Sequence, residues 1–186
     1  WAPPGPNGYP DALAAWATHE TLLLGSSNTA RFFDSSVAGA TRGARVLANR
    51  GLAGIDGLVS TAYGLALGLG EPVRVVLGDL AFQHDVGGLA RGDVEADADV
   101  QVIVLDDHGG GIFATLEHGR SEPAVLRRFF TTPQDVDLAA AAAAFGADAR
   151  TLDVGELPAV LAAPVTGRSV LVVRLDDGPR PGARRP

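Results

Sequence analysis

The sequence of 186 residues contains no cysteine and no methionine, and aromatic residues make up only 6% of it. The absence of cysteine excludes a disulfide framework and any metal site built on thiolates. The sequence shows no signal peptide and no apolar run long enough to span a bilayer, so we expect a cytoplasmic protein. A net charge of −7 argues against a general nucleic-acid binder, because phosphate backbones require clustered positive charge.

The composition that is present, 46% apolar residues and 24 glycines, is typical of an α/β domain with a proper core. Because the chain starts at Trp1 and holds no methionine, we expect it to be a piece of a longer protein. Proline-rich residues 1–10 and the segment up to residue 20 are interpreted as a linker with a short leading helix. Residues 21–176 form the predicted domain, and residues 177–186 are predicted to be a disordered tail.

Six short runs rich in β-branched residues and leucine predict strands. They cover residues 21–24, 44–48, 73–77, 100–105, 150–152 and 169–175. Helices are predicted at residues 11–19, 28–37, 55–69, 82–90, 123–129, 137–145 and 156–163. This alternation predicts an α/β fold: an open parallel sheet with helices on both faces.

Two of the predicted strands end in acidic turns. Asp79 follows residues 73–77, and Asp106 and Asp107 follow residues 100–105. If these strands are neighbours in a parallel sheet, the acids meet at its carboxyl edge, where open α/β sheets bind ligands. Carboxylates beside glycine-rich turns suit Mg²⁺ carrying a phosphorylated cofactor. The residues alone leave a second interpretation open, in which these acids only cap helices and solvate turns.

Gly78-Asp79-Leu80, followed after 25 residues by Asp106-Asp107, resembles the signature of thiamine-diphosphate enzymes. Together with the stretches 49–57, 107–113 and 128–136, it makes the chain resemble one family from about Leu22 to Leu175. That family is 2-succinyl-5-enolpyruvyl-6-hydroxy-3-cyclohexene-1-carboxylate (SEPHCHC) synthase. The resemblance covers only the C-terminal, diphosphate-binding domain of that longer enzyme.

The resemblance implies a role for several residues. Asp79, Asp107 and the Gly109 carbonyl would hold Mg²⁺ or Mn²⁺. The cofactor thiamine diphosphate would lie against Gly54, Ile55, Asp56, Gly57, Gly78, Asp79, Leu80, Gly109, Gly110 and Ile112. Substrate would contact Ser27, Arg31, Arg50, Ile112 and Phe113. Arginine suits the family's dicarboxylate substrates, 2-oxoglutarate and isochorismate, because its planar fork matches a carboxylate.

The sequence departs from the family at two positions of the acidic turn. The family usually has asparagine where this chain has Asp107, and His108 replaces a small polar residue. An additional carboxylate favours a cation but repels the diphosphate beyond it. The residues leave open which acid of the pair Asp106 and Asp107 would be the ligand.

The family's reaction decarboxylates 2-oxoglutarate and adds the succinyl semialdehyde–thiamine diphosphate carbanion to isochorismate, giving SEPHCHC for menaquinone biosynthesis. Its activating glutamate comes from a separate N-terminal pyrimidine-binding domain, across a dimer interface. We therefore expect no catalytic residue in this chain, a homodimer or higher homo-oligomer, and no activity from the chain alone. Two alternatives stay open: another thiamine-diphosphate enzyme, of acetolactate synthase or 2-oxoacid decarboxylase type, and a non-enzymatic Rossmann-like binding domain.

Overall fold

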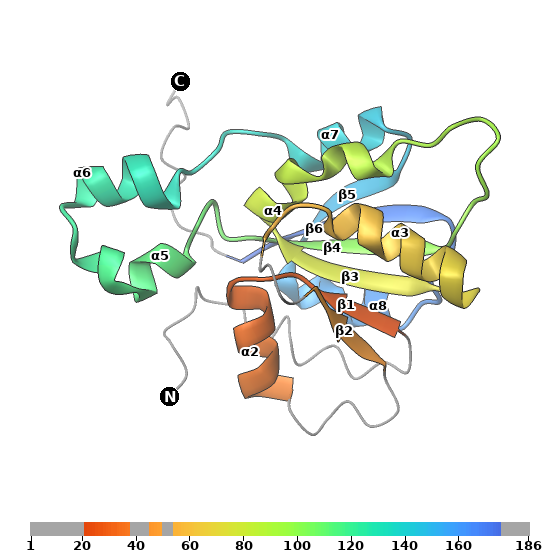
Figure 1. Ribbon diagram of the computed structural model, residues 1–186, viewed down its shortest axis with the longest axis horizontal. Coiled ribbons are helices and arrows are strands. Elements are labelled where there is room, and N and C mark those ends of the chain that lie inside the picture. Colours follow the sequence, from red (N-terminus) through yellow and green to blue (C-terminus); the bar gives the residue numbers. More distant parts are fainter. Residues whose placement is uncertain (1–20, 38–44, 50–53, 176–186) are drawn as a thin grey trace.

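The computed structural model describes residues 21–37, 45–49 and 54–175 (Figure 1). Within these residues one sheet contains six parallel strands in the order β2-β1-β3-β4-β6-β5. The strands are β1 Thr21–Leu24, β2 Val46–Ala48, β3 Val73–Gly78, β4 Val100–Asp106, β5 Asp148–Asp153 and β6 Arg168–Arg174. The predicted open parallel sheet is confirmed. The predicted linker, the helix at 11–19, the tail and Arg50 lie outside the described residues.

Short helices connect the strands. They are α2 Asn28–Val37, α3 Leu58–Leu69, α4 Asp79–His84, α5 Ile112–Thr115, α6 Pro123–Leu126, α7 Leu138–Ala144 and α8 Leu157–Leu161. Single turns of tighter or wider helix cover Val86–Leu89, Glu117–Arg120, Arg127–Thr131 and Val154–Glu156. No helix in the described part of the chain is long and apolar enough to cross a lipid bilayer.

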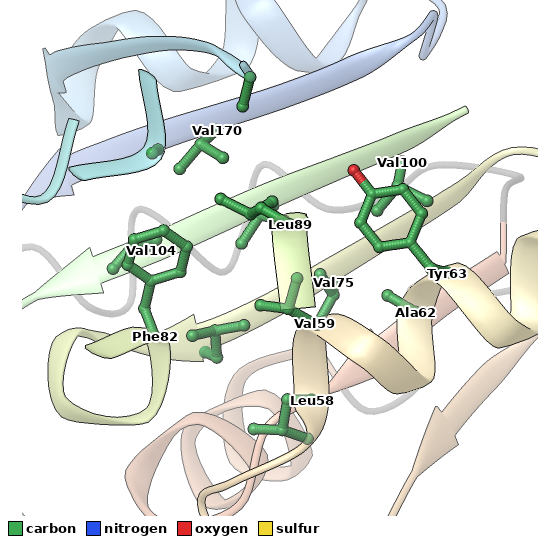
Figure 2. Close-up of a cluster of buried hydrophobic side chains, with 14 of the residues drawn as sticks. Leu58, Val59, Ala62, Tyr63, Val75, Phe82, Leu89, Val100, Val104 and Val170 are labelled. Carbon is green, nitrogen blue, oxygen red and sulfur yellow. The ribbon is translucent and has the colours of Figure 1, made fainter. Parts of the chain in front are cut away.

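The sheet is covered on both faces, as predicted. Helices α3, α4 and α7 pack on one face, and α2 and α8 pack on the other. Neighbouring strand residues alternate between the two cores, so Val75 belongs to the first and Val76 to the second. Figure 2 shows the first core, where Val59 and Phe82 lie over the sheet. Burial on both faces explains why the central strands are continuous apolar runs.

The strand order places a crevice at one edge of the sheet. Helix α2, which follows β1, packs on one face, whereas α4, which follows the neighbouring strand β3, packs on the other. The two connections therefore leave the carboxyl edge in opposite directions. Open α/β sheets bind ligands at such a switch point.

One helix prediction was wrong. The helix predicted at 82–90 starts three residues earlier, at Asp79, and a separate turn covers Val86–Leu89. The Asp79 carboxylate accepts a hydrogen bond from the Leu80 N–H group (2.8 Å), and a negative charge in the first turn stabilises a helix. After Phe113, where the sequence pattern is weak, the segment containing α5 and α6 projects away from the sheet (Figure 1).

We expect the Phe82→Ala substitution to lower the free energy of unfolding by about 3–5 kcal/mol, because it leaves a cavity in a packed core. Phe82 is fully buried. Val94→Ala is the control: Val94 is 94% exposed, and the change should stay within about 0.5 kcal/mol. Urea denaturation measures both. Equal effects of the two substitutions would contradict this description of the core.

Candidate functional site

A cavity of about 130 Å³ opens at the carboxyl edge of the sheet. The segments after β1, β3 and β4 all line it, together with the loop before α3. The structure brings ten of the predicted site residues together in its wall: Ser27, Ile55, Gly78, Asp79, Leu80, Asp107, Gly109, Gly110, Ile112 and Phe113. The convergence follows from strand pairing, since Gly78 at the end of β3 pairs with Leu105 at the end of β4.

Two carboxyl groups lie in the wall of this cavity: Asp79 is buried and Asp107 is partly buried. Burial raises the pKa of Asp79 to about 7, and the charge of Asp106 adds to the rise, although the N–H groups of Leu80 and Gly109 oppose it. Burial likewise raises the pKa of Asp107 to about 8, and the charges of Asp79 and Asp106 add to it. Both carboxylates thus lack a compensating positive charge, and a divalent cation between them would supply it.

The structure distinguishes Asp106 from Asp107. Asp106 is the last residue of β4, and its carboxylate accepts a hydrogen bond from the His108 N–H group (3.2 Å). Asp107 lines the cavity, whereas Asp106 does not. His108 has a positive φ of 63°, and the turn at this residue leads into the glycine-rich loop. Asp107 is therefore the acid of this pair that a bound cation would meet.

The loop of Gly109, Gly110 and Gly111 packs so closely that side chains do not fit. A Cβ atom on Gly109, whose φ is 128°, would lie 2.3 Å from the Thr131 carbonyl oxygen. A Cβ atom on Gly111 would lie 2.6 Å from Asp107 Oδ2. The Gly110 N–H group donates to the same Thr131 carbonyl (2.7 Å). Bare backbone thus faces the carboxylates, as a diphosphate cradle requires.

The residues present fit a hard cation that brings ligands of its own. No three His, Cys, Asp or Glu side chains converge on a metal position within the described residues. Two carboxylates, the Gly109 carbonyl, diphosphate oxygens and water would complete the octahedron of oxygen ligands that Mg²⁺ prefers. All three residues of the predicted ligand set, Asp79, Asp107 and Gly109, line this cavity.

An aromatic cluster supports the apolar wall of the cavity. The Phe113 ring packs edge-on against His118, with 5.8 Å between centroids, and lies 5.9 Å from Phe130. His118 and Phe130 are 4.5 Å apart. Sequence reasoning did not find this role for His118, because the three rings come from segments with no common periodicity. The cluster fixes the segment after the glycine loop.

Several predicted site residues do not line the cavity. Gly54 and Asp56 are exposed, and Gly57 precedes α3 with a positive φ of 69°. Arg31 is exposed on α2 and donates to the Ser27 carbonyl (2.8 Å). Arg50 lies outside the described residues. Of the two predicted substrate-binding arginines, the structure therefore describes only Arg31, which does not line the cavity.

Sequence reasoning missed four residues of the wall: Ser26, Asn28, Thr29 and Ala81. Three of them belong to one polar run that follows β1 directly. A polar run at the carboxyl end of a buried strand is the signal that could have indicated them.

Comparison with known families gives one match over most of the chain. Residues 29–174 match the family described as "Thiamine pyrophosphate enzyme, C-terminal TPP binding domain"; thiamine pyrophosphate (TPP) is another name for thiamine diphosphate. The matched range contains β2 to β6 and nearly all of the cavity wall.

Two similar proteins share the same name. The chain is 48% identical over 173 residues to the 2-succinyl-5-enolpyruvyl-6-hydroxy-3-cyclohexene-1-carboxylate synthase of Renibacterium salmoninarum, covering 89% of this chain and 31% of that protein. The protein of the same name from Kineococcus radiotolerans is 43% identical, with 97% of this chain and 33% of that protein covered. The chain therefore spans about a third of the length of these relatives.

A solved structure has the same fold. The crystal structure of benzoylformate decarboxylase from Polynucleobacter necessarius matches with a TM-score of 0.63 at 21% identity. The match covers 90% of this chain and 32% of that one. At this identity the likeness shows the fold alone.

The raised pKa values predict a pH-dependent stability for the metal-free chain. An unfolded aspartate titrates near 3.8, whereas the folded values for Asp79 and Asp107 are about 7 and about 8. The folded chain therefore holds more protons in this window, and these groups' contribution to stability is lost as the pH rises through it. We expect the free energy of unfolding to fall with rising pH relative to an Asp79→Asn, Asp107→Asn double variant.

Urea denaturation between pH 4 and pH 8 with a chelator present measures this difference. Asp148→Asn, at an exposed position in β5, serves as the control and should follow the wild-type profile. If wild type and the double variant changed in parallel over the whole window, the assignment of the buried acids would be wrong.

Proposed function

This chain belongs to the thiamine pyrophosphate enzymes as their C-terminal TPP-binding domain, and we propose that it holds the metal–diphosphate half of the active site of a SEPHCHC synthase. One observation carries the proposal: Asp79 and Asp107 share a cavity with a glycine loop in a chain 43–48% identical to synthases of that name. Family membership also removes the alternative of a non-enzymatic Rossmann-like domain.

In this proposal Asp79, Asp107 and the Gly109 carbonyl coordinate Mg²⁺ or Mn²⁺. Backbone N–H groups of the loop at 54–57 face the diphosphate. In the loop at 109–111 the N–H groups of Gly109 and Gly110 already donate to Asp79 and to the Thr131 carbonyl, so this loop contributes space for the diphosphate rather than donors. Helix α3 begins directly after the first loop, and its Ser60 N–H group is bound by Asp85 (2.9 Å). The earlier N–H groups of the helix make no intrahelical bond and favour an anion at that end.

The remaining residues shape the space around the reacting carbon. Ile55, Ile112 and Phe113 form an apolar wall that excludes water. Thiamine diphosphate, when bound, supplies the stabilised carbanion that joins decarboxylated 2-oxoglutarate to isochorismate. Ser27, Arg31 and Arg50 bind the carboxylates of these substrates, since arginine pairs with a carboxylate through two charge-assisted hydrogen bonds. The hydrogen bond of Arg31 to Ser27 supports a common location for the first two.

A different thiamine-diphosphate reaction is the second candidate. The fold is shared with benzoylformate decarboxylase, but at 21% identity, and fold alone does not assign a substrate. The relatives at 43–48% identity instead carry the synthase name. The family likeness therefore favours the synthase over an acetolactate synthase or a 2-oxoacid decarboxylase.

The proposal assigns the rest of the site to a partner domain. The chain corresponds to about a third of each relative, and we place the activating glutamate in a separate N-terminal pyrimidine-binding domain of the same enzyme. That domain would meet the cavity across the interface of a homodimer or higher homo-oligomer.

We expect thiamine diphosphate to bind this chain only when Mg²⁺ is present, and Asp79→Ala to weaken the binding by more than about 100-fold. A direct ligand contributes more than its outer-shell partners, whose loss costs about 10–100-fold. Isothermal titration calorimetry measures the dissociation constants, with the exposed Asp148→Ala as control. Binding that is independent of metal, or equal in the Asp79 variant, would count against the proposed site.

We expect the chain alone to give no SEPHCHC from 2-oxoglutarate and isochorismate, even with thiamine diphosphate and Mg²⁺, because the proposal places the activating glutamate in a separate domain. Product formation is followed by chromatography and mass spectrometry, and the synthase of Renibacterium salmoninarum serves as the positive control. Product made by this chain as the sole protein would refute the division of the site between two domains.

A further inference from the structure

Asn28, which none of the assigned roles includes, is a buried polar residue of the cavity. It is the first residue of α2, its side chain is 6% exposed, and it lines the cavity. Its Oδ1 atom has no hydrogen-bond partner among the described residues. Asparagine at a helix start usually caps the helix by accepting a backbone N–H bond. Asn28 does not do so, and an unsatisfied buried amide opposes folding.

Among the described residues, Tyr63, Arg91 and His118 also have buried polar atoms without a partner, but none of them lines the cavity. Buried polar side chains of the neighbouring strands are satisfied. Thr21, at the opposite end of β1, donates to Glu71, and Gln101 accepts from Arg74 (2.9 Å). Buried polar groups in native proteins generally have such partners, so each exception requires a reason. A group kept ready for a ligand is one such reason, because ligand binding provides the missing partner.

The position of Asn28 indicates what kind of ligand it would bind. A Cβ atom on Gly111 would lie 2.6 Å from Asp107 Oδ2 and 3.9 Å from Asn28 Nδ2. The carboxylate and the amide nitrogen therefore approach the same glycine. The N-terminus of α2, a helix of 10 residues, lies at this point and favours negative charge. Asn28 therefore lies where an anion would extend if it were bound to a cation held by Asp79 and Asp107.

We propose that Asn28 is a positioning residue of this site: its amide nitrogen donates to a diphosphate oxygen, and its amide oxygen accepts from a water on the metal. A carboxamide has both a donor and an acceptor and carries no charge. Diphosphate oxygens only accept, so the amide oxygen requires the metal-bound water, which is a strong donor. This inference rests on the proposed function and adds a residue to it.

Two substitutions test the role of Asn28, Asn28→Ala and Asn28→Asp. The dissociation constant of thiamine diphosphate with Mg²⁺ should rise by about 10-fold or more in the alanine variant. It should rise further in the aspartate variant, because a carboxylate repels the diphosphate. The melting temperature of the ligand-free alanine variant should equal or exceed that of wild type, because the unsatisfied amide is gone.

Thr21→Val is the matched control, since it removes a satisfied buried polar group from the start of β1, the strand that precedes α2, at the end far from the cavity. It should lower or preserve the melting temperature and leave the dissociation constant unchanged. The inference alone would be overturned if the Asn28→Ala variant bound thiamine diphosphate as wild type does. It would also be overturned if Asn28→Asp bound thiamine diphosphate better than Asn28→Ala. Absence of Mg²⁺-dependent binding in wild type would instead overturn the proposed function, and the inference with it.

Discussion

Two carboxylates that repel each other, one buried and one partly buried, are the constraint around which this domain is organised. Asp79 and Asp107 follow adjacent central strands, and burial together with neighbouring acids raises the pKa of each. A fold selected for stability alone would not place acids there, because burying a charge without a partner is costly. The central strands are buried on both faces, and this packing holds the carboxylates close together in the absence of a cation.

The glycine loop connects this pair to the projecting segment. Its backbone contacts Thr131 on one side and Asp107 on the other, at distances that exclude any side chain. The rings of Phe113, His118 and Phe130 then fix the segment against the loop. Gly109, Gly110 and Gly111 therefore connect the carboxylates to the segment that carries part of the apolar wall.

Three local departures from ideal structure lie at or beside the cavity, although those at Thr132, Tyr63, Arg91 and His118 lie outside its wall. Ser27 and His108 have positive φ angles of 76° and 63°, and Asn28 keeps an unsatisfied amide. Such features persist where surrounding packing determines them, and they cluster at functional sites. In this domain these three lie at or beside one cavity, which is consistent with stability being given up there for binding.

The sequence by itself determined the fold class, the strands and the family, because these follow from local periodicity and from motifs that each lie within a short stretch. It also placed Asp79 and Asp107 at strand ends. Only the tertiary structure decided that Asp107 faces the cavity while Asp106 holds the turn, that the helix starts at Asp79, and that Asn28 lines the site. These features depend on a positive φ at His108 and on the packing of segments distant in sequence. A pattern of residue types carries no record of such contacts, since they exist only once the strands have paired.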